Sequence, residues 1–173
     1  MKTINLFTIG LFVFLFSSCV TSNVSFNNNP DYHTKIKSAF IEVKDVKIQK
    51  FLDRLSESLI DTLKNSDVSV KLLVNDALSL NSEKDIQKQV HDFHPDVIIV
   101  LERVDTKMGH SRYGYYYDGG TYLMSIVLPE TNKIIWKSSI LTTREQSNIS
   151  GLNKVIGKTI GKIIAKMKTD QLL

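Results

Sequence analysis

The sequence predicts one α/β domain, a two-layer or three-layer sandwich built on a single mixed sheet. Two observations support this prediction. Up to residue 101, short β-branched runs alternate with stripes of apolar residues spaced three and four apart, an order typical of parallel strands joined by helices. Beyond residue 101, two apolar runs flank a short turn, and a last amphipathic stripe follows. This second pattern indicates an antiparallel hairpin and a C-terminal helix.

The composition is that of a globular protein whose core is held by packing. The 173 residues are 42% hydrophobic and 23% charged, and the single cysteine excludes an internal disulfide. The formal net charge of +4 is a mild basicity, which suits anionic lipid, a cell-wall polymer or an acidic protein surface.

The first elements follow from apolar spacing. Ser38–Val43 predicts a strand, and a helix is expected from Asp45 to about Lys64, with one apolar stripe and one charged face. Residues 68–74 alternate at first and predict a second strand.

A second helix and a central strand come next. Residues 82–85 resemble a capping box, so a helix is expected to begin there, and His94 ends it because the next residue is proline. Val97–Leu101 is short, β-branched and wholly apolar, which predicts a central strand covered on both faces.

The second half predicts a hairpin and a closing helix. Residues 122–128 and 134–142 are the two strands, and residues 129–133 form the tight turn between them. The last helix is expected from Gly151 to about Lys168. Its lysines recur every four residues in one stripe, which suits either solvent exposure or anionic lipid. Gly157 and Gly161 suggest close packing on the sheet in preference to dimerisation.

The first 18 residues carry the features of a secretory signal peptide. Lys2 supplies a positive charge, residues 4–16 are almost continuously apolar, and small residues follow. The run Leu15-Phe16-Ser17-Ser18-Cys19 resembles the lipobox of bacterial lipoproteins. The resemblance implies cleavage between Ser18 and Cys19 and acylation of Cys19, which anchors the chain in a membrane.

The segment after Cys19 is rich in Asn and Ser and interrupted by Pro30. We expect residues 19–36 to be a flexible tether and residues 37–173 to be the α/β domain. We expect the chain to be lipid-anchored in the bacterial outer membrane. No acidic cluster follows Cys19, and this favours a protein that faces the periplasm.

The turn of the predicted hairpin suggests a family. A strand, then Pro129-Glu130-Thr131-Asn132-Lys133, then Ile134-Ile135-Trp136, resembles the acidic-Thr-Gly-Lys-hydrophobic-Trp turn of small envelope lipoproteins. This group includes the curli secretion lipoprotein, the lipoprotein activator of penicillin-binding proteins and the amino-terminal domain of the Tol propeller protein. Asn132 stands at the usual glycine position, where Asn tolerates the same positive φ. The resemblance implies a non-enzymatic accessory or assembly role.

Residues 108–120 are the most individual stretch, with four tyrosines in five positions and glycines around them. Tyrosine is enriched at recognition surfaces, and Arg112 adds a fork for carboxylate or phosphate. The stretch suits a partner-binding or glycan-binding loop, a plain connection, or half of a membrane-inserting hairpin. The predicted partner-binding residues are Arg112, Tyr113, Tyr115, Tyr116 and Tyr117.

No motif for catalysis, a cofactor or a metal stands out. His91 and His94 lie three apart without a third ligand, and His110 has no nucleophile elbow beside it. The leading hypothesis is therefore a non-catalytic envelope lipoprotein that binds a protein partner, with homo-oligomer formation left open. The alternatives are a subunit of a secretion pore or lipid-transport system and, third, a periplasmic hydrolase. Nucleic acid is not an expected partner of an exported chain.

Overall fold

The computed structural model describes residues 21–30, 32, 34–44, 50–75, 81–143 and 149–173. Its elements follow in the order β1 (Thr21–Asn28), β2 (Ser38–Lys44), α2 (Lys50–Lys64), β3 (Ser69–Asn75), α3 (Glu83–Phe93), β4 (Val97–Ser111), β5 (Gly114–Val127), β6 (Ile134–Thr143) and α4 (Ile149–Thr169). In this part of the chain, no helix is both long enough and apolar enough to cross a membrane.

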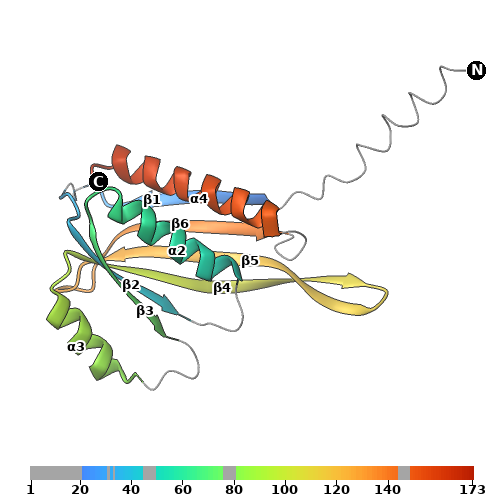
Figure 1. Ribbon diagram of the computed structural model, residues 1–173, viewed down its shortest axis with the longest axis horizontal. Coiled ribbons are helices and arrows are strands. Elements are labelled where there is room, and N and C mark those ends of the chain that lie inside the picture. Colours follow the sequence, from blue (N-terminus) through green and yellow to red (C-terminus); the bar gives the residue numbers. More distant parts are fainter. Residues whose placement is uncertain (1–20, 31, 33, 45–49, 76–80, 144–148) are drawn as a thin grey trace, which may run out of the picture.

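The strands form one mixed sheet in the order β1-β6-β5-β4-β2-β3 (Figure 1). β2 pairs in parallel with both β3 and β4, whereas β4, β5, β6 and β1 pair successively in antiparallel. The predicted α/β class, the parallel first half and the antiparallel 122–142 hairpin are therefore confirmed.

The core lies between the sheet and the two helices α2 and α4, which cover the same face (Figure 1). Residues Val97, Ile99 and Leu101 of β4 point into this core and are fully buried. Their neighbours Ile98 and Val100 point to the opposite face and are only half-buried. The prediction that both faces of this strand are covered is therefore only partly right, because α3 covers a limited part of the second face.

α3 packs on that second face through few contacts. None of its residues is buried, and the Phe93 ring lies 6.3 Å from the ring of Phe40 in β2. The predicted capping box is present, since the Ser82 hydroxyl accepts from the Asp85 amide while the Asp85 carboxylate accepts from the Ser82 amide. The hydrogen bonds from Ser82 also lower the pKa of Asp85. The helix ends at His94, as expected before Pro95, and His94 itself adopts the left-handed conformation with a φ of 50°.

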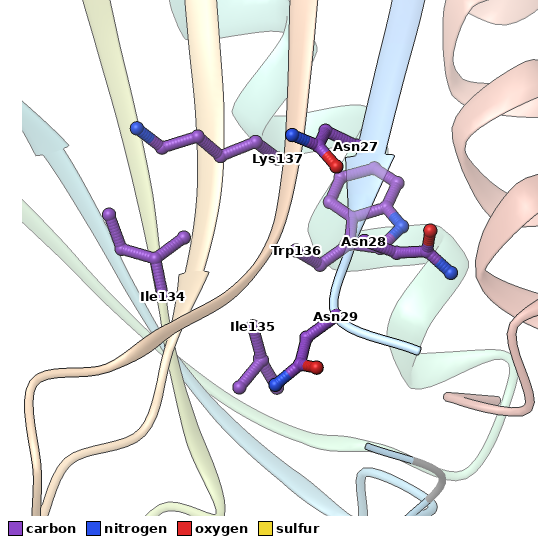
Figure 2. Close-up of a pocket in the computed structure, with 7 residues that line it drawn as sticks. All are labelled: Asn27, Asn28, Asn29, Ile134, Ile135, Trp136 and Lys137. Carbon is purple, nitrogen blue, oxygen red and sulfur yellow. The ribbon is translucent and has the colours of Figure 1, made fainter. Parts of the chain in front are cut away.

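β1 corrects the tether prediction. Residues 21–28 were expected to be flexible, yet they form an edge strand paired with β6 from Thr21–Thr143 to Asn28–Trp136. Val24 and Phe26 pack against the core, and the Phe26 ring lies 5.5 Å from the Trp136 ring. The end of β1 lies beside Trp136 (Figure 2). Two apolar side chains are enough here because β6 supplies the hydrogen-bond ladder.

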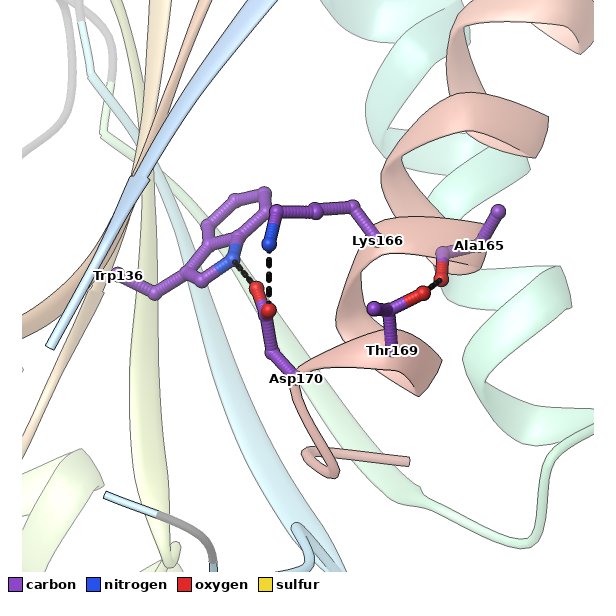
Figure 3. Close-up of polar contacts among 5 residues, drawn as sticks. All are labelled: Trp136, Ala165, Lys166, Thr169 and Asp170. Carbon is purple, nitrogen blue, oxygen red and sulfur yellow. Dashed lines mark hydrogen bonds and ion pairs between the residues drawn. The ribbon is translucent and has the colours of Figure 1, made fainter. Parts of the chain in front are cut away.

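Trp136 joins the hairpin to the end of α4 (Figure 3). It is 1% exposed, and its Nε1 donates to Oδ2 of Asp170 at 3.0 Å. The Lys166 ammonium donates to the other carboxylate oxygen of Asp170. The turn before Trp136 has Asn132 at φ 52°, which confirms the expected positive φ.

Asp170→Ala should lower the free energy of unfolding by about 1–3 kcal/mol, because it leaves the buried Trp136 N–H without its acceptor. Asp170→Asn should cost less, since its amide oxygen still accepts that bond. Urea unfolding followed by the fluorescence of the single tryptophan measures both. Thr169→Ala, which removes an exposed hydroxyl bonded to the Ala165 carbonyl, is the control and should change stability by under about 0.5 kcal/mol. Equal losses in all three variants would contradict the assigned role of Asp170.

Candidate partner-binding hairpin

β4 and β5 extend beyond the rest of the sheet as an arm. β4 pairs with β2 only as far as Glu102, and β5 pairs with β6 only from Thr121 onward. Residues 105–120 therefore pair almost wholly with each other, and they project from one end of the molecule (Figure 1). From Asp105 to Ser111 the arm spans about 20 Å at the usual rise of a strand.

Two bulges mark the base of this arm. The β4–β5 register shifts between Arg103 and Asp105 and again between Lys107 and Met108. Bulges bend a strand and increase its twist, so they direct the arm away from the plane of the sheet.

Glycine lets β5 approach β6 at the arm's base. A Cβ on Gly119 would lie 2.5 Å from the carbonyl oxygen of Thr142. The buried Thr142 hydroxyl bonds both the N–H and the C=O of Gly120, each at 3.1 Å. The arm therefore rests on a close backbone contact.

The tip of the arm gathers the aromatic residues that the sequence singled out. Ser111 and Gly114 pair across a turn made of Arg112 and Tyr113, and Gly114 takes a φ of 117°. Tyr113 is 84% exposed and Tyr115 is 79% exposed.

Weak ring contacts order this tip. The Arg112 guanidinium lies 4.6 Å from the centre of the Tyr113 ring, a cation–π distance. The His110 and Tyr115 rings meet edge to face at 5.1 Å. The Tyr116 ring lies across Gly109, where a side chain would collide with it. The tip thus presents rings that are held in place but not covered.

The predicted loop at residues 108–120 is therefore wrong as a structure, although its residues do gather at one place. Arg112 and Tyr113 form the turn, Tyr115 and Tyr116 follow on β5, and the backbone of Tyr117 pairs with Met108. Sequence reasoning missed the exposed apolar residue Val104 of β4, whereas the exposed Met108 belongs to the stretch that it singled out. A strand that is uncovered on both faces shows no apolar alternation, and the turn residues Arg112 and Tyr113 are not a typical hairpin-turn pair, so the sequence carried no clear signal for this hairpin.

The histidines do not form a metal site in the part of the chain described. His91 and His94 lie at the end of α3 with ring centres 5.2 Å apart, and no group of three metal-ligating side chains occurs among the described residues. His110 lies on the arm beside Tyr115, and His33, Ser18 and Cys19 fall outside the described residues.

A shallow pocket lies at the opposite end of the sheet, where β1 ends beside β6 (Figure 2). Its volume is about 180 Å³. Amide side chains and one cation dominate its polar lining, which suits a small polar group. The lining residues are Asn27, Asn28, Asn29, Ile134, Ile135, Trp136 and Lys137.

No protein-family model matches the sequence, and no curated protein matches it. Among solved structures, the chain is similar to the PelC dodecamer from Paraburkholderia phytofirmans, with a TM-score of 0.54 and 12% identity over 88% of this chain and 99% of that one. A leucine-to-methionine variant of the PelC dodecamer from the same organism, in another crystal form, gives a TM-score of 0.53 at 12% identity over 87% of this chain and 99% of that one. Lipoprotein GNA1162 from Neisseria meningitidis gives a TM-score of 0.46, 12% identity and coverage of 74% and 98%. The likeness to PelC shows a shared fold.

Gly119→Ala should lower the free energy of unfolding by about 1–3 kcal/mol, because the added methyl group meets the backbone of β6. Gly157→Ala on α4 is the matched control. A Cβ there meets nothing within 4 Å, so alanine should raise stability by about 0.5–1 kcal/mol through helix propensity. Thermal unfolding of both variants measures the two shifts, and a stabilised Gly119→Ala protein would overturn the close contact.

Proposed function

We propose that this chain is a non-catalytic envelope lipoprotein that binds a protein partner through the tip of the β4–β5 arm. The observation that carries the proposal is the arm itself, which displays Tyr113, Tyr115 and Tyr116 away from the core. Exposed aromatic rings cost free energy in water and contribute strongly to binding when a partner covers them, as do arginines.

The position of the proposed anchor supports a partner at the membrane. Thr21 of β1 pairs with Thr143 of β6, and Leu141 of β6 pairs with Thr121 of β5, so β1 begins at the end of the sheet from which the arm projects. Cys19 stands two residues before Thr21. An acyl anchor on Cys19 would therefore hold the arm near the membrane, within reach of an envelope protein in the same membrane.

A photo-crosslinking residue at position 115 tests the partner-binding role in intact cells. We expect a captured envelope protein at position 115 and none at position 87, an exposed site on α3. Capture of the same proteins at both positions, or at neither, would contradict the proposal.

Tyr113→Ala combined with Tyr115→Ala should weaken binding of the captured partner at least about tenfold, since buried aromatic anchors at interfaces are commonly worth about 2 kcal/mol or more. The fold should be unaffected because both rings are exposed. Ile134→Ala, which truncates an exposed apolar residue at the opposite end of the sheet, is the control and should leave the affinity unchanged. Binding is measured by titration of the partner against the full chain.

Cys19→Ala should abolish fatty-acid labelling and release the chain from the membrane fraction, because the thiol that carries the acyl chains is lost. Metabolic labelling with a radioactive fatty acid measures this. Labelling that persists in the variant would mean that acylation occurs elsewhere.

A second candidate function is that of a subunit in a homo-oligomeric envelope assembly, such as a secretion or lipid-transport system. The observation that favours it is the shared fold with PelC, which forms a dodecamer. This role and partner binding through the arm are compatible, because the arm occupies one end of the domain and leaves its other surfaces free for copies of the chain.

A further inference from the structure

The outer surface of the helical layer carries two separate rows of charge. α2 and α4 lie side by side on the sheet and run in the same direction (Figure 1). Near their first turns, Nη1 of Arg54 donates to Oδ1 of Asn153 at 3.0 Å, which sets the helices in register.

The two rows have opposite signs and the same spacing. On α2, Asp53, Glu57 and Asp61 are exposed and four residues apart. On α4, exposed lysines follow the same four-residue spacing, and the helix contains no acidic residue. Each step is about 6 Å along the helix axis. The basic row is Lys154, Lys158 and Lys162.

The two rows do not neutralise each other in the described part of the domain. In the part of the chain that the structure describes, no ion pair joins the acidic row to the basic one. Partial burial and the charge of Glu57 raise the pKa of Asp53, as expected for a carboxylate beside a like charge. Lys166, in contrast, is paired with Asp170.

Two glycines on the outer face of α4 point to a close neighbour. The sequence suggested that Gly157 and Gly161 allow close packing on the sheet, and this is wrong, because both are exposed and a Cβ on either meets nothing within 4 Å. Glycine weakens a helix interior, and no contact inside the domain requires it here. A surface without side chains at these positions lets a second helix approach between the lysines.

We propose that two copies of this chain pair through their α2–α4 layers about a two-fold axis parallel to the helices. Such an axis places α2 of one copy over α4 of the other and keeps their direction. Glu57 then faces Lys158, and Asp61 faces Lys162, with an offset of two residues, about 3 Å. The same contacts occur twice because a two-fold interface is self-complementary. This inference rests on the second candidate function, the homo-oligomeric subunit.

Charge exchange in the full chain tests the pairing. Glu57→Lys with Asp61→Lys makes the two facing positions on α2 basic like those on α4. Lys158→Glu with Lys162→Glu makes the two facing positions on α4 acidic like those on α2. Each double variant alone should self-associate at least about tenfold more weakly than the natural chain, because like charges then face each other. An equimolar mixture of the two should associate again. Analytical ultracentrifugation of the detergent-extracted chains measures these affinities.

A matched control and the salt dependence complete the test. Lys84→Glu with Lys88→Glu reverses two exposed lysines at the same spacing on α3 and should leave self-association unchanged. Self-association of the natural chain should weaken at about 1 M salt, where charges are screened beyond a few ångströms. Gly157→Ala should weaken self-association while it stabilises the monomer.

The outcomes separate this inference from the function on which it rests. If the natural chain is monomeric at all concentrations, both the pairing and the homo-oligomeric role fail. If it self-associates and the double variants do so equally well, the pairing through α2 and α4 fails and the homo-oligomeric role stands. If the mixture of double variants stays monomeric, the proposed register is wrong.

Discussion

Burial of one sheet face under α2 and α4 is the constraint on which the rest of the molecule depends. The chain has a single cysteine, so packing must stabilise the fold without an internal disulfide. Both helices therefore bury a full apolar stripe against the sheet. Each buried leucine or isoleucine contributes about 1.5–3 kcal/mol to the free energy of folding. Trp136 and Asp170 close this layer at one end, because they tie β6 to the last residues of the chain. The core is formed on one face of the sheet only. Binding can therefore use the remaining surfaces, which are the outer surface of the helices, the second face of the sheet and the arm.

Much of the fold follows from the sequence because its signals are local. Three predicted features depend only on residues close together in the sequence, and all three are present. They are the apolar stripe of α2, the capping box at Ser82 and the turn before Trp136. The run at Val97 predicted a central strand, and β4 does lie between β5 and β2.

The failures involve pairing over long distances. β1 has only Val24 and Phe26 as apolar anchors, and its place at the sheet edge depends on β6, more than a hundred residues later. The arm gives no apolar alternation because neither of its faces is covered, so residues 108–120 looked like a loop. The glycines of α4 were assigned to the wrong face because a Gly-x-x-x-Gly pattern does not state which side of a helix is buried. The tyrosine-rich stretch was recognised from its composition, and composition can be read without knowing which strands pair.

Only one residue separates Cys19 from β1 in the sequence, and this has a mechanical consequence for a lipid-anchored chain. A long flexible tether would let the domain tumble and sample all orientations near a membrane. Because β1 begins at Thr21, an acylated Cys19 would leave almost no slack, and the anchor would pull directly on an edge strand that is hydrogen-bonded along its length. The sheet would then be attached to the membrane at one fixed point and would reorient as a single rigid body. Its orientation, and with it the height of the arm above the bilayer, would be set by the geometry of one strand.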